Sequence, residues 1–161
     1  MMDIVDKATR SRMMSNIRGR DTGPELLLRR ALHQLGFRFR IHAKKLPGKP
    51  DLVLPKYRAA IFIHGCFWHR HRQCRLATTP ATRPDFWNAK FSGTMERDAR
   101  VHDALLRSGW RVATIWECAL RKPQDVSTVA EIVAKWLPSE LEILEIGSDD
   151  LDFEEGATGD G

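Results

Sequence analysis

Residues 61–74 read IFIHGCFWHRHRQC, and this stretch decides the fold because it joins an apolar strand to a loop crowded with reactive side chains. It holds two cysteines, three histidines and the aromatic pair Phe67-Trp68. Asp51, which follows Pro50, lies ten residues upstream of it. The pattern predicts a strand whose carboxyl end presents metal-binding and aromatic side chains together.

The composition favours one soluble domain. The chain has 161 residues, which suits a single well-buried domain. Its longest apolar run, residues 59–63, is far below membrane-spanning length, and its amino terminus alternates charges where a signal peptide would be apolar. We therefore expect a cytoplasmic protein, in which three cysteines indicate a metal site more readily than disulfides.

Charge is distributed unevenly along the chain. Residues 138–161 hold nine acids and no Lys or Arg, so residues 1–137 hold 26 basic and 12 acidic residues, a net charge of +14. A cationic surface of this size attracts polyanions, and nucleic acid is the first candidate because each neutralised phosphate releases counterions. A surface that only improves solubility is the alternative.

We expect three parts along the chain. Residues 1–20 form a basic arm that contacts DNA, residues 21–137 form the folded domain, and residues 138–161 form an acidic, disordered tail. Periodicity within the domain predicts, in order, a helix over 22–36, a strand over 37–42, a hairpin of 51–54 and 59–64, helices over 85–91 and 94–108, a strand over 110–116 and a helix over 126–137. This order predicts an α/β fold with a mixed sheet flanked by helices.

Every cysteine in the chain can join one set of four metal ligands. Cys66, His71 and Cys74 lie within nine residues of one another, and Cys118 follows a later strand. Such a Cys3His tetrad is closed and structural, and it would fasten the loop after one strand to the end of another. The alternative is that the cysteines are inert core residues, although a loop rich in His and Arg is a poor place for burial without a metal.

Asp51 is the one obvious carboxylate for a catalytic metal. An acid after Pro50 at the start of a strand, followed by a hairpin, is the layout in which many nucleases hold Mg²⁺ against a scissile phosphate. No Asp or Glu occurs between Asp51 and Asp85, so main-chain carbonyls, water and phosphate oxygens would complete the metal shell. An ordinary turn-forming aspartate is the alternative.

Two histidines outside the tetrad, His64 and His69, lie beside the same strand end. An imidazole there can accept the proton of an attacking water or stabilise a phosphorane, although either residue could be an ordinary loop histidine. Glu25 is explained by a capping box with Thr22 and is kept as a secondary site residue.

Large aromatic side chains in loops form a further group of candidates. Phe67, Trp68 and Trp87 could insert between base pairs as wedges, because stacking of roughly 1–3 kcal/mol per base offsets the cost of opening a step. A mismatched step is the easiest to open. The alternative is that Trp87 and one residue of the pair belong to the core.

Motifs between residues 6 and 120 also carry a resemblance. They are DKATRS (6–11), PGKPD (47–51), the IFIHGCFWHRH block (61–71), PATR (80–83) with Phe86-Trp87, ERD (96–98), GWRV (109–112) and WECAL (116–120). Together they resemble the very short patch repair endonuclease (Vsr) family, over residues 3–122. Two features depart from the family pattern: residue 63 is Ile where Thr is usual, and the segment between His71 and Cys74 is one residue longer.

The resemblance implies a PD-(D/E)XK restriction-endonuclease-like fold with a structural zinc site. It also implies a Mg²⁺-dependent nick in double-stranded DNA beside the thymine of a T:G mismatch, the lesion left when 5-methylcytosine deaminates. The roles that it implies are Mg²⁺ ligands at Asp51 and the main-chain carbonyl of Ile63, a general base at His69, supporting catalytic residues at His64 and Glu25, zinc ligands at Cys66, His71, Cys74 and Cys118, and DNA-intercalating or mismatch-contacting residues at Phe67, Trp68, Trp87, Met14 and Lys90.

We therefore expect a mismatch endonuclease that starts very short patch repair. It should act as a monomer in the bacterial cytoplasm, at the nucleoid when bound to DNA, and the resemblance implies a functional link to a cytosine-5 DNA methyltransferase and to repair proteins. The alternatives are a related nuclease with a different target site, a non-catalytic zinc-stapled DNA-binding module, and a regulator whose acidic tail is its working part.

Overall fold

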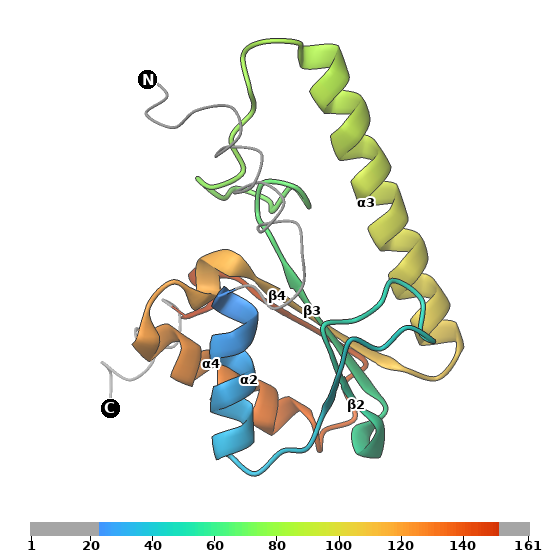
Figure 1. Ribbon diagram of the computed structural model, residues 1–161, viewed down its shortest axis with the longest axis vertical. Helices are drawn as coiled ribbons and strands as arrows, with labels where there is room; N and C mark the ends of the chain where they lie inside the picture. Colours follow the sequence, from blue (N-terminus) through green and yellow to red (C-terminus); the bar gives the residue numbers. More distant parts are fainter. Residues whose placement is uncertain (1–22, 152–161) are drawn as a thin grey trace.

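A five-stranded mixed sheet forms the centre of the protein (Figure 1). The computed structural model describes residues 23–151. The strands lie in the order of the sequence: β1 (Arg40–Ile41), β2 (Leu52–Leu54), β3 (Ala59–His64), β4 (Arg111–Trp116) and β5 (Ile143–Ile146). The helical elements are α2 (Gly23–Gln34), α3 (Pro84–Arg107), α4 (Pro123–Trp136) and two short 3-10 helices, η1 (Pro55–Tyr57) and η2 (Glu117–Leu120).

The connections between strands explain why the sheet is mixed. β1, β2 and β3 pair antiparallel, and η1 turns the chain from β2 into β3 as the expected hairpin. β3, β4 and β5 pair parallel, because α3 carries the chain back from β3 to β4 and α4 carries it back from β4 to β5. The expectation of a mixed sheet flanked by helices is confirmed.

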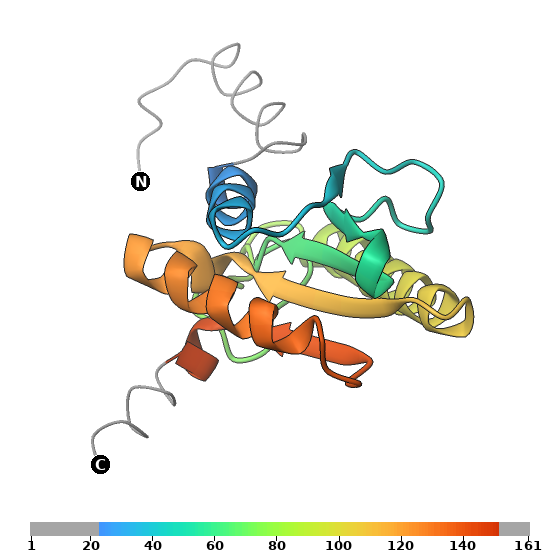
Figure 2. The ribbon, with the colours of Figure 1, turned by 90° about the horizontal axis from the view of Figure 1, so that it is seen from below.

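Helices flank the sheet (Figure 2), and its two faces have separate cores. On one face, apolar residues of α2 and α4 pack with the strands, among them Leu28, Ile61 and Val133. On the other face, the carboxyl-terminal part of α3 packs Leu105 against Phe62 and its neighbours. Consecutive side chains of β3 therefore enter opposite cores, as the alternation of a strand requires.

Helix α3 is one helix where the sequence predicted two. It runs through Gly93, which lies between the two expected helices, for 24 residues in all. A glycine in a helix costs roughly 1 kcal/mol relative to alanine, and that cost does not outweigh continued main-chain hydrogen bonding. As a result the first half of α3 projects from the body together with the loop that follows β3 (Figure 1).

The carboxyl-terminal segment also differs from the expectation. Disorder was predicted from residue 138, but Ile143–Ile146 form β5 in the sheet and Leu151 is 7% exposed. The expectation was wrong as far as residue 151. The main chain of this acidic segment pairs with β4, and its alternating apolar side chains can cover the core. Residues 152–161, the basic arm of residues 1–20 and Met14 lie outside the described residues.

The first turn of α2 and the length of β1 were predicted only approximately. Thr22, the proposed capping residue, lies outside the described residues, and the strand expected over 37–42 is limited to Arg40–Ile41. Within residues 23–151, no helix combines the length and the apolar character needed to cross a membrane.

Replacing Arg111 by Met should lower the free energy of unfolding by about 2–3 kcal/mol. The guanidinium of Arg111 donates to the carbonyls of Trp136 and Leu137 at 2.7 Å and of Leu141 at 2.9 Å, so it fastens the end of α4 to the chain that enters β5. Chemical denaturation would measure the loss. Arg107→Met is the control, because the exposed Arg107 pairs, within residues 23–151, only with Asp103. Its loss should cost less than about 0.5 kcal/mol. Equal losses would show that the Arg111 contacts contribute nothing.

Candidate active site and metal centre

Main-chain hydrogen bonds hold Asp51 at the end of β3. The Asp51 N–H donates to the Ile61 carbonyl at 3.0 Å, and the Ile63 N–H donates to Asp51 Oδ2 at 2.6 Å. The antiparallel register, in which Leu52 faces Ile61, places the carboxylate there. The structure thus brings together Asp51 and residue 63, the two positions that the resemblance implies as Mg²⁺ ligands.

Glu25 adds a buried carboxylate beside the partly buried Asp51. It is 5% exposed on α2, accepts a hydrogen bond from Arg29 at 3.1 Å, and lines a small pocket with Asp51. Burial, opposed by the Ile63 N–H and reinforced by the Glu25 carboxylate, raises the pKa of Asp51 to about 7. Two carboxylates buried together are costly unless a cation joins them, and oxygen donors suit a hard divalent ion. These residues therefore fit a divalent cation.

His69 is held by an aspartate that the sequence analysis missed. Its Nδ1 lies 2.7 Å from Oδ2 of Asp98, a residue of α3. The ring of His64 stacks on that of His69, with centroids 3.8 Å apart and planes 7° from parallel. His64 and His69 come from the end of β3 and the loop after it, so the pairing with α3 depends on the long crossover helix.

The electrostatics of this group give its members different protonation states. Burial, reinforced by the neighbouring His69, lowers the pKa of His64 to about 3, so His64 is neutral at physiological pH. Burial alone would raise the pKa of Asp98, but the hydrogen bond from His69 and the charges of the neighbouring histidines together lower that pKa. An anionic Asp98 favours the tautomer of His69 with its proton on Nδ1, which leaves Nε2 free to accept a proton. This is the arrangement of an oriented general base.

His102 is the other residue of this group that sequence reasoning missed. It lies one helical turn after Asp98, and its ring is 5.4 Å from Phe62 and 6.0 Å from His64. The spacing of four residues between Asp98 and His102 was the available signal, because it puts both on one face of a helix. That signal gains meaning only when the helix is known to cross the end of β3.

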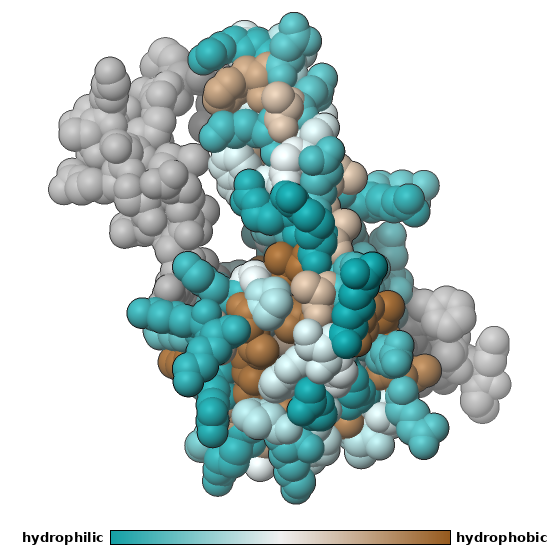
Figure 3. All heavy atoms as spheres, turned by 90° about the vertical axis from the view of Figure 1, so that its right-hand side faces the viewer, coloured by the Kyte–Doolittle hydropathy of each residue, from teal (hydrophilic) through white to brown (hydrophobic). Residues whose placement is uncertain are grey.

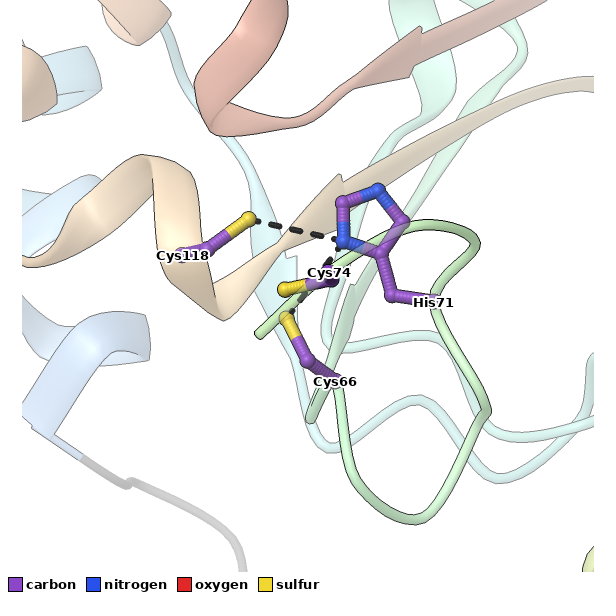
Figure 4. A group of neighbouring side chains, drawn as sticks. All are labelled: Cys66, His71, Cys74 and Cys118. Atoms are coloured by element: carbon purple, nitrogen blue, oxygen red, sulfur yellow. Dashed lines mark hydrogen bonds between the residues drawn. The ribbon is translucent and has the colours of Figure 1, made fainter. Parts of the chain in front are cut away.

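The three cysteines and His71 converge on one point (Figure 4). His71 Nδ1 is 3.6 Å from Cys66 Sγ and 3.5 Å from Cys118 Sγ, and with Cys74 the four donor atoms lie within 4.8 Å of one another. Cys66 and Cys74 come from the loop after β3, whereas Cys118 lies in η2 after β4. The set joins the ends of two parallel strands, and it could hold a metal ion.

The thiols of Cys66 and Cys118 influence each other's pKa. The hydrogen bond with Cys66 lowers the pKa of Cys118 to about 5, and the same contact raises the pKa of Cys66. A pair that shares one proton is held by that proton, and a metal ion in its place would allow both sulfurs to be thiolates. The donors therefore fit a thiophilic metal.

The ring of His71 is fixed from two sides. The Trp116 ring stacks on it, with centroids 4.3 Å apart and planes 11° from parallel. On Gly147, an added Cβ would lie 2.7 Å from Cε1 of His71. Ser148 donates its N–H to Cys118 Sγ at 3.4 Å, so the chain after β5 closes over the cluster.

The candidate wedge residues form an aromatic cluster on the projecting part of the molecule. Phe67, Trp68 and Trp87 are half-buried, and their ring centroids lie 5.0–5.8 Å apart in pairs. Phe91, which is 5% exposed, packs beneath Phe67 and Trp87 and anchors them to α3. Figure 3 shows apolar atoms near this end of the molecule, surrounded by hydrophilic side chains. The aromatics are therefore neither core residues nor isolated surface residues.

Lys90 lies on the same part of α3, exposed, with its ammonium 5.5 Å from the Phe86 ring. A cation beside an exposed aromatic group is suited to contact a phosphate or a base edge.

Comparison with known proteins adds to this geometry. A model of the family described as "DNA mismatch endonuclease Vsr" matches residues 2–76. The "DNA mismatch endonuclease Vsr" of Escherichia coli (strain K12) is 45% identical over 142 residues, which cover 87% of this chain and 90% of that protein. The "Type II nicking enzyme V.XorIIP" of Xanthomonas oryzae pv. oryzae is 44% identical over 120 residues, which cover 74% of this chain and 88% of that protein.

Replacing Asp51 by Asn should stabilise the protein in buffer without added divalent cation, and increasingly so at higher pH. The folded-state pKa of about 7 lies above the ordinary value of 3.8, so the stability that the protonated carboxyl contributes is full below pH 3.8 and is lost as the pH rises through about 7. Asparagine does not ionise, so the variant does not lose this stability as the pH rises. Denaturation from about pH 4 to about pH 8 should show the variant gaining on the order of a few kcal/mol over the wild type. A difference that does not change with pH would contradict the burial argument.

Proposed function

This chain belongs to the DNA mismatch endonuclease Vsr family, and we propose that it nicks double-stranded DNA beside the thymine of a T:G mismatch. The observation that carries the proposal is that a carboxylate pair and a histidine held by an aspartate both lie at the end of β3. One group fits a cation that would bind a phosphate, and the other fits the removal of a proton from water. Phosphodiester hydrolysis needs both.

His69 is the proposed general base. It would accept a proton from the attacking water on Nε2, while Asp98 keeps the Nδ1 proton in place and stabilises the imidazolium that forms. His64 stays neutral and stacks flat on His69, so it limits the rotation of that ring. General-base catalysis of this kind contributes on the order of 10²–10⁴ in rate.

Asp51, Glu25 and the main-chain carbonyl of Ile63 are the proposed holders of Mg²⁺. An oxygen-only donor set favours Mg²⁺ over softer metals. When bound, Mg²⁺ would neutralise charge on the scissile phosphate. A carbonyl ligand at residue 63 requires no hydroxyl, so isoleucine at this position is compatible with the role.

Zn²⁺ is the proposed occupant of the Cys66, His71, Cys74 and Cys118 set. Four protein donors of this type, with none left for water, are typical of structural zinc. The ion would tie the loop that carries Phe67 and His69 to the end of β4, and so keep the aromatic cluster and the general base in fixed relation.

The aromatic cluster supports a T:G mismatch as the target of the nick. Phe67, Trp68 and Trp87 stand half-exposed at the projecting end of a protein whose first 137 residues carry a net charge of +14. Phosphate contacts position a protein without reading sequence, whereas aromatic side chains that enter the stack test how easily a base step opens. A T:G step opens more easily than a paired one. The lesion would arise by deamination of 5-methylcytosine, which links the protein to a cytosine-5 DNA methyltransferase and to the enzymes that fill the repair patch.

A second candidate follows from the printed names of relatives. Several similar proteins, including those of Xanthomonas oryzae and Neisseria meningitidis, are named type II nicking enzymes. The target of this chain could therefore be defined mainly by the flanking sequence. Duplexes that combine T:G, T:A and C:G pairs with varied flanks separate the two possibilities, because only mismatch recognition predicts no nicking of fully paired duplexes.

In the direct test of function, the wild-type protein should nick the thymine strand of a T:G duplex in Mg²⁺. Asp51→Asn should reduce the rate on the order of a thousandfold, because stabilisation of the phosphate charge is worth several kcal/mol. Mismatch affinity should stay within about threefold, since Asp51 contacts none of the wedge residues. Reactions without Mg²⁺ are better controls than reactions with a chelator, which would also remove zinc. Wild-type rates in Asp51→Asn would refute the metal role, and binding without nicking by the wild type would favour the non-catalytic alternative.

Gly147→Ala should speed the loss of zinc to a chromogenic chelator by about tenfold or more. The new Cβ would lie 2.7 Å from His71, so either the imidazole or the chain after β5 must move. A displaced ligand weakens the site, as loss of an outer contact commonly does by 10–100-fold. Gly93→Ala is the matched control, because nothing lies within 4 Å of its Cβ position and alanine favours the helix. Equal rates of zinc loss for the two variants would show that the carboxyl-terminal segment does not support the metal site.

A further inference from the structure

Arg70 fastens the loop after β3 to the segment that precedes α3. Its Nη1 donates to the carbonyls of Phe67 at 3.2 Å and Thr78 at 2.9 Å. Its Nη2 donates to the Ala77 carbonyl at 3.1 Å and to Thr79 Oγ1 at 3.0 Å. One side chain therefore joins two stretches of loop that no strand or helix connects.

The guanidinium of Arg70 also lies against the aromatic cluster. Its carbon is 4.0 Å from the centroid of the Phe91 ring and 5.8 Å from that of Phe67. Phe91 is the buried member on which Phe67 and Trp87 pack, with centroid distances of 5.3 Å and 5.8 Å. Arg70 thus contacts the base of the cluster and holds the main chain of its first member.

The main chain at Arg70 is in the left-handed region, with φ of 56°. Residues other than glycine rarely adopt this conformation unless surrounding contacts hold it. The turn lets Arg70 face the aromatic cluster while its two neighbours serve other sites: His69 faces Asp98, and His71 faces the cysteines.

Arg70 is poorly suited to a phosphate contact. A guanidinium has five N–H donors, and four of those of Arg70 are used within the protein. Arg72, two residues later, is exposed and makes no side-chain hydrogen bond within residues 23–151, so it can serve the DNA backbone. The two arginines have the same charge in the same loop and different surroundings.

We propose that Arg70 is a positioning residue that holds Phe67, Trp68 and Trp87 in the arrangement that enters the DNA stack, and that it thereby sets mismatch discrimination. The inference rests on the proposed function. A wedge that is already ordered loses little conformational entropy on insertion, whereas a loose one must be ordered at the cost of binding free energy. The lost binding free energy would weaken the insertion step, which is the step that distinguishes T:G from paired DNA.

The test compares Arg70→Lys, Arg70→Asn and Arg72→Asn with the wild type. Lysine keeps the charge without the planar fork, and asparagine suits the left-handed main chain, so at least one Arg70 variant should fold. Rates of nicking on T:G duplexes and affinities for T:G and T:A duplexes give the discrimination. Fluorescence of 2-aminopurine next to the mismatch, with protein in excess, reports unstacking directly.

Both Arg70 variants should lose about tenfold in the ratio of T:G to T:A affinity, which corresponds to about 1.4 kcal/mol. Their 2-aminopurine signal in the bound state should fall, while zinc content stays at the wild-type value. Arg72→Asn should keep the ratio and the signal, and should weaken binding to both duplexes alike. Salt dependence of binding should change for Arg72→Asn and not for Arg70→Lys.

Two outcomes would overturn the proposal. Wild-type discrimination and 2-aminopurine signal in Arg70→Lys and Arg70→Asn would show that the aromatic cluster keeps its arrangement without Arg70. A loss of discrimination in Arg72→Asn as large as in Arg70→Asn would assign the effect to charge. Failure of the wild-type protein to nick or to prefer T:G duplexes would instead contradict the proposed function, so the two failures are distinguishable.

Discussion

The register of β3 is the constraint on which both candidate sites depend. β3 pairs with β2 on one side and β4 on the other, and its consecutive residues enter opposite cores, Ile61 toward α2 and α4 and Phe62 toward α3. The strand ends with the Ile63 N–H on Asp51 and with His64 stacked on His69. A slip of one residue would exchange the faces and break both arrangements at once. The packed cores on the two faces make such a slip expensive, so the chemistry at the strand end is held by apolar packing elsewhere.

The groups that this packing holds are unfavourable by themselves. The Asp51 carboxylate lies beside that of the buried Glu25, and the thiols of Cys66 and Cys118 shift each other's pKa. Neither arrangement would persist in a chain free to rearrange, since buried like charges repel and desolvation favours the neutral forms. Each becomes favourable when a cation is added. The fold therefore holds in advance the donor atoms that a metal ion would otherwise have to order.

Much of this could be predicted from the sequence, because local spacing carries the information. The Cys66, His71 and Cys74 spacing and the Asp51 strand each lie within one short segment. Asp98 and His102 could not be found in the same way, because their meaning depends on where α3 crosses β3. β5 was missed for a different reason: residues 140–146 read ELEILEI, an alternation typical of an edge strand, but the acidic composition favoured disorder.

Helix α3 connects recognition to chemistry through one rigid element. Its 24 residues extend about 36 Å, with Trp87 and Phe91 near the projecting end and Asp98 and His102 where it meets the sheet. Trp87 and Asp98 are therefore about 16 Å apart along one helix axis. The loop after β3 makes the same connection by a shorter path, because only Trp68 separates Phe67 from His69. Arg70 also ties that loop to the segment before α3. If the aromatic cluster enters the DNA stack as proposed, a step that accepts it would fix both paths, and a step that does not open would leave the cluster outside the stack. His69 would then be held in place relative to a phosphate only on DNA that has been opened, so that discrimination and cleavage share one geometric requirement.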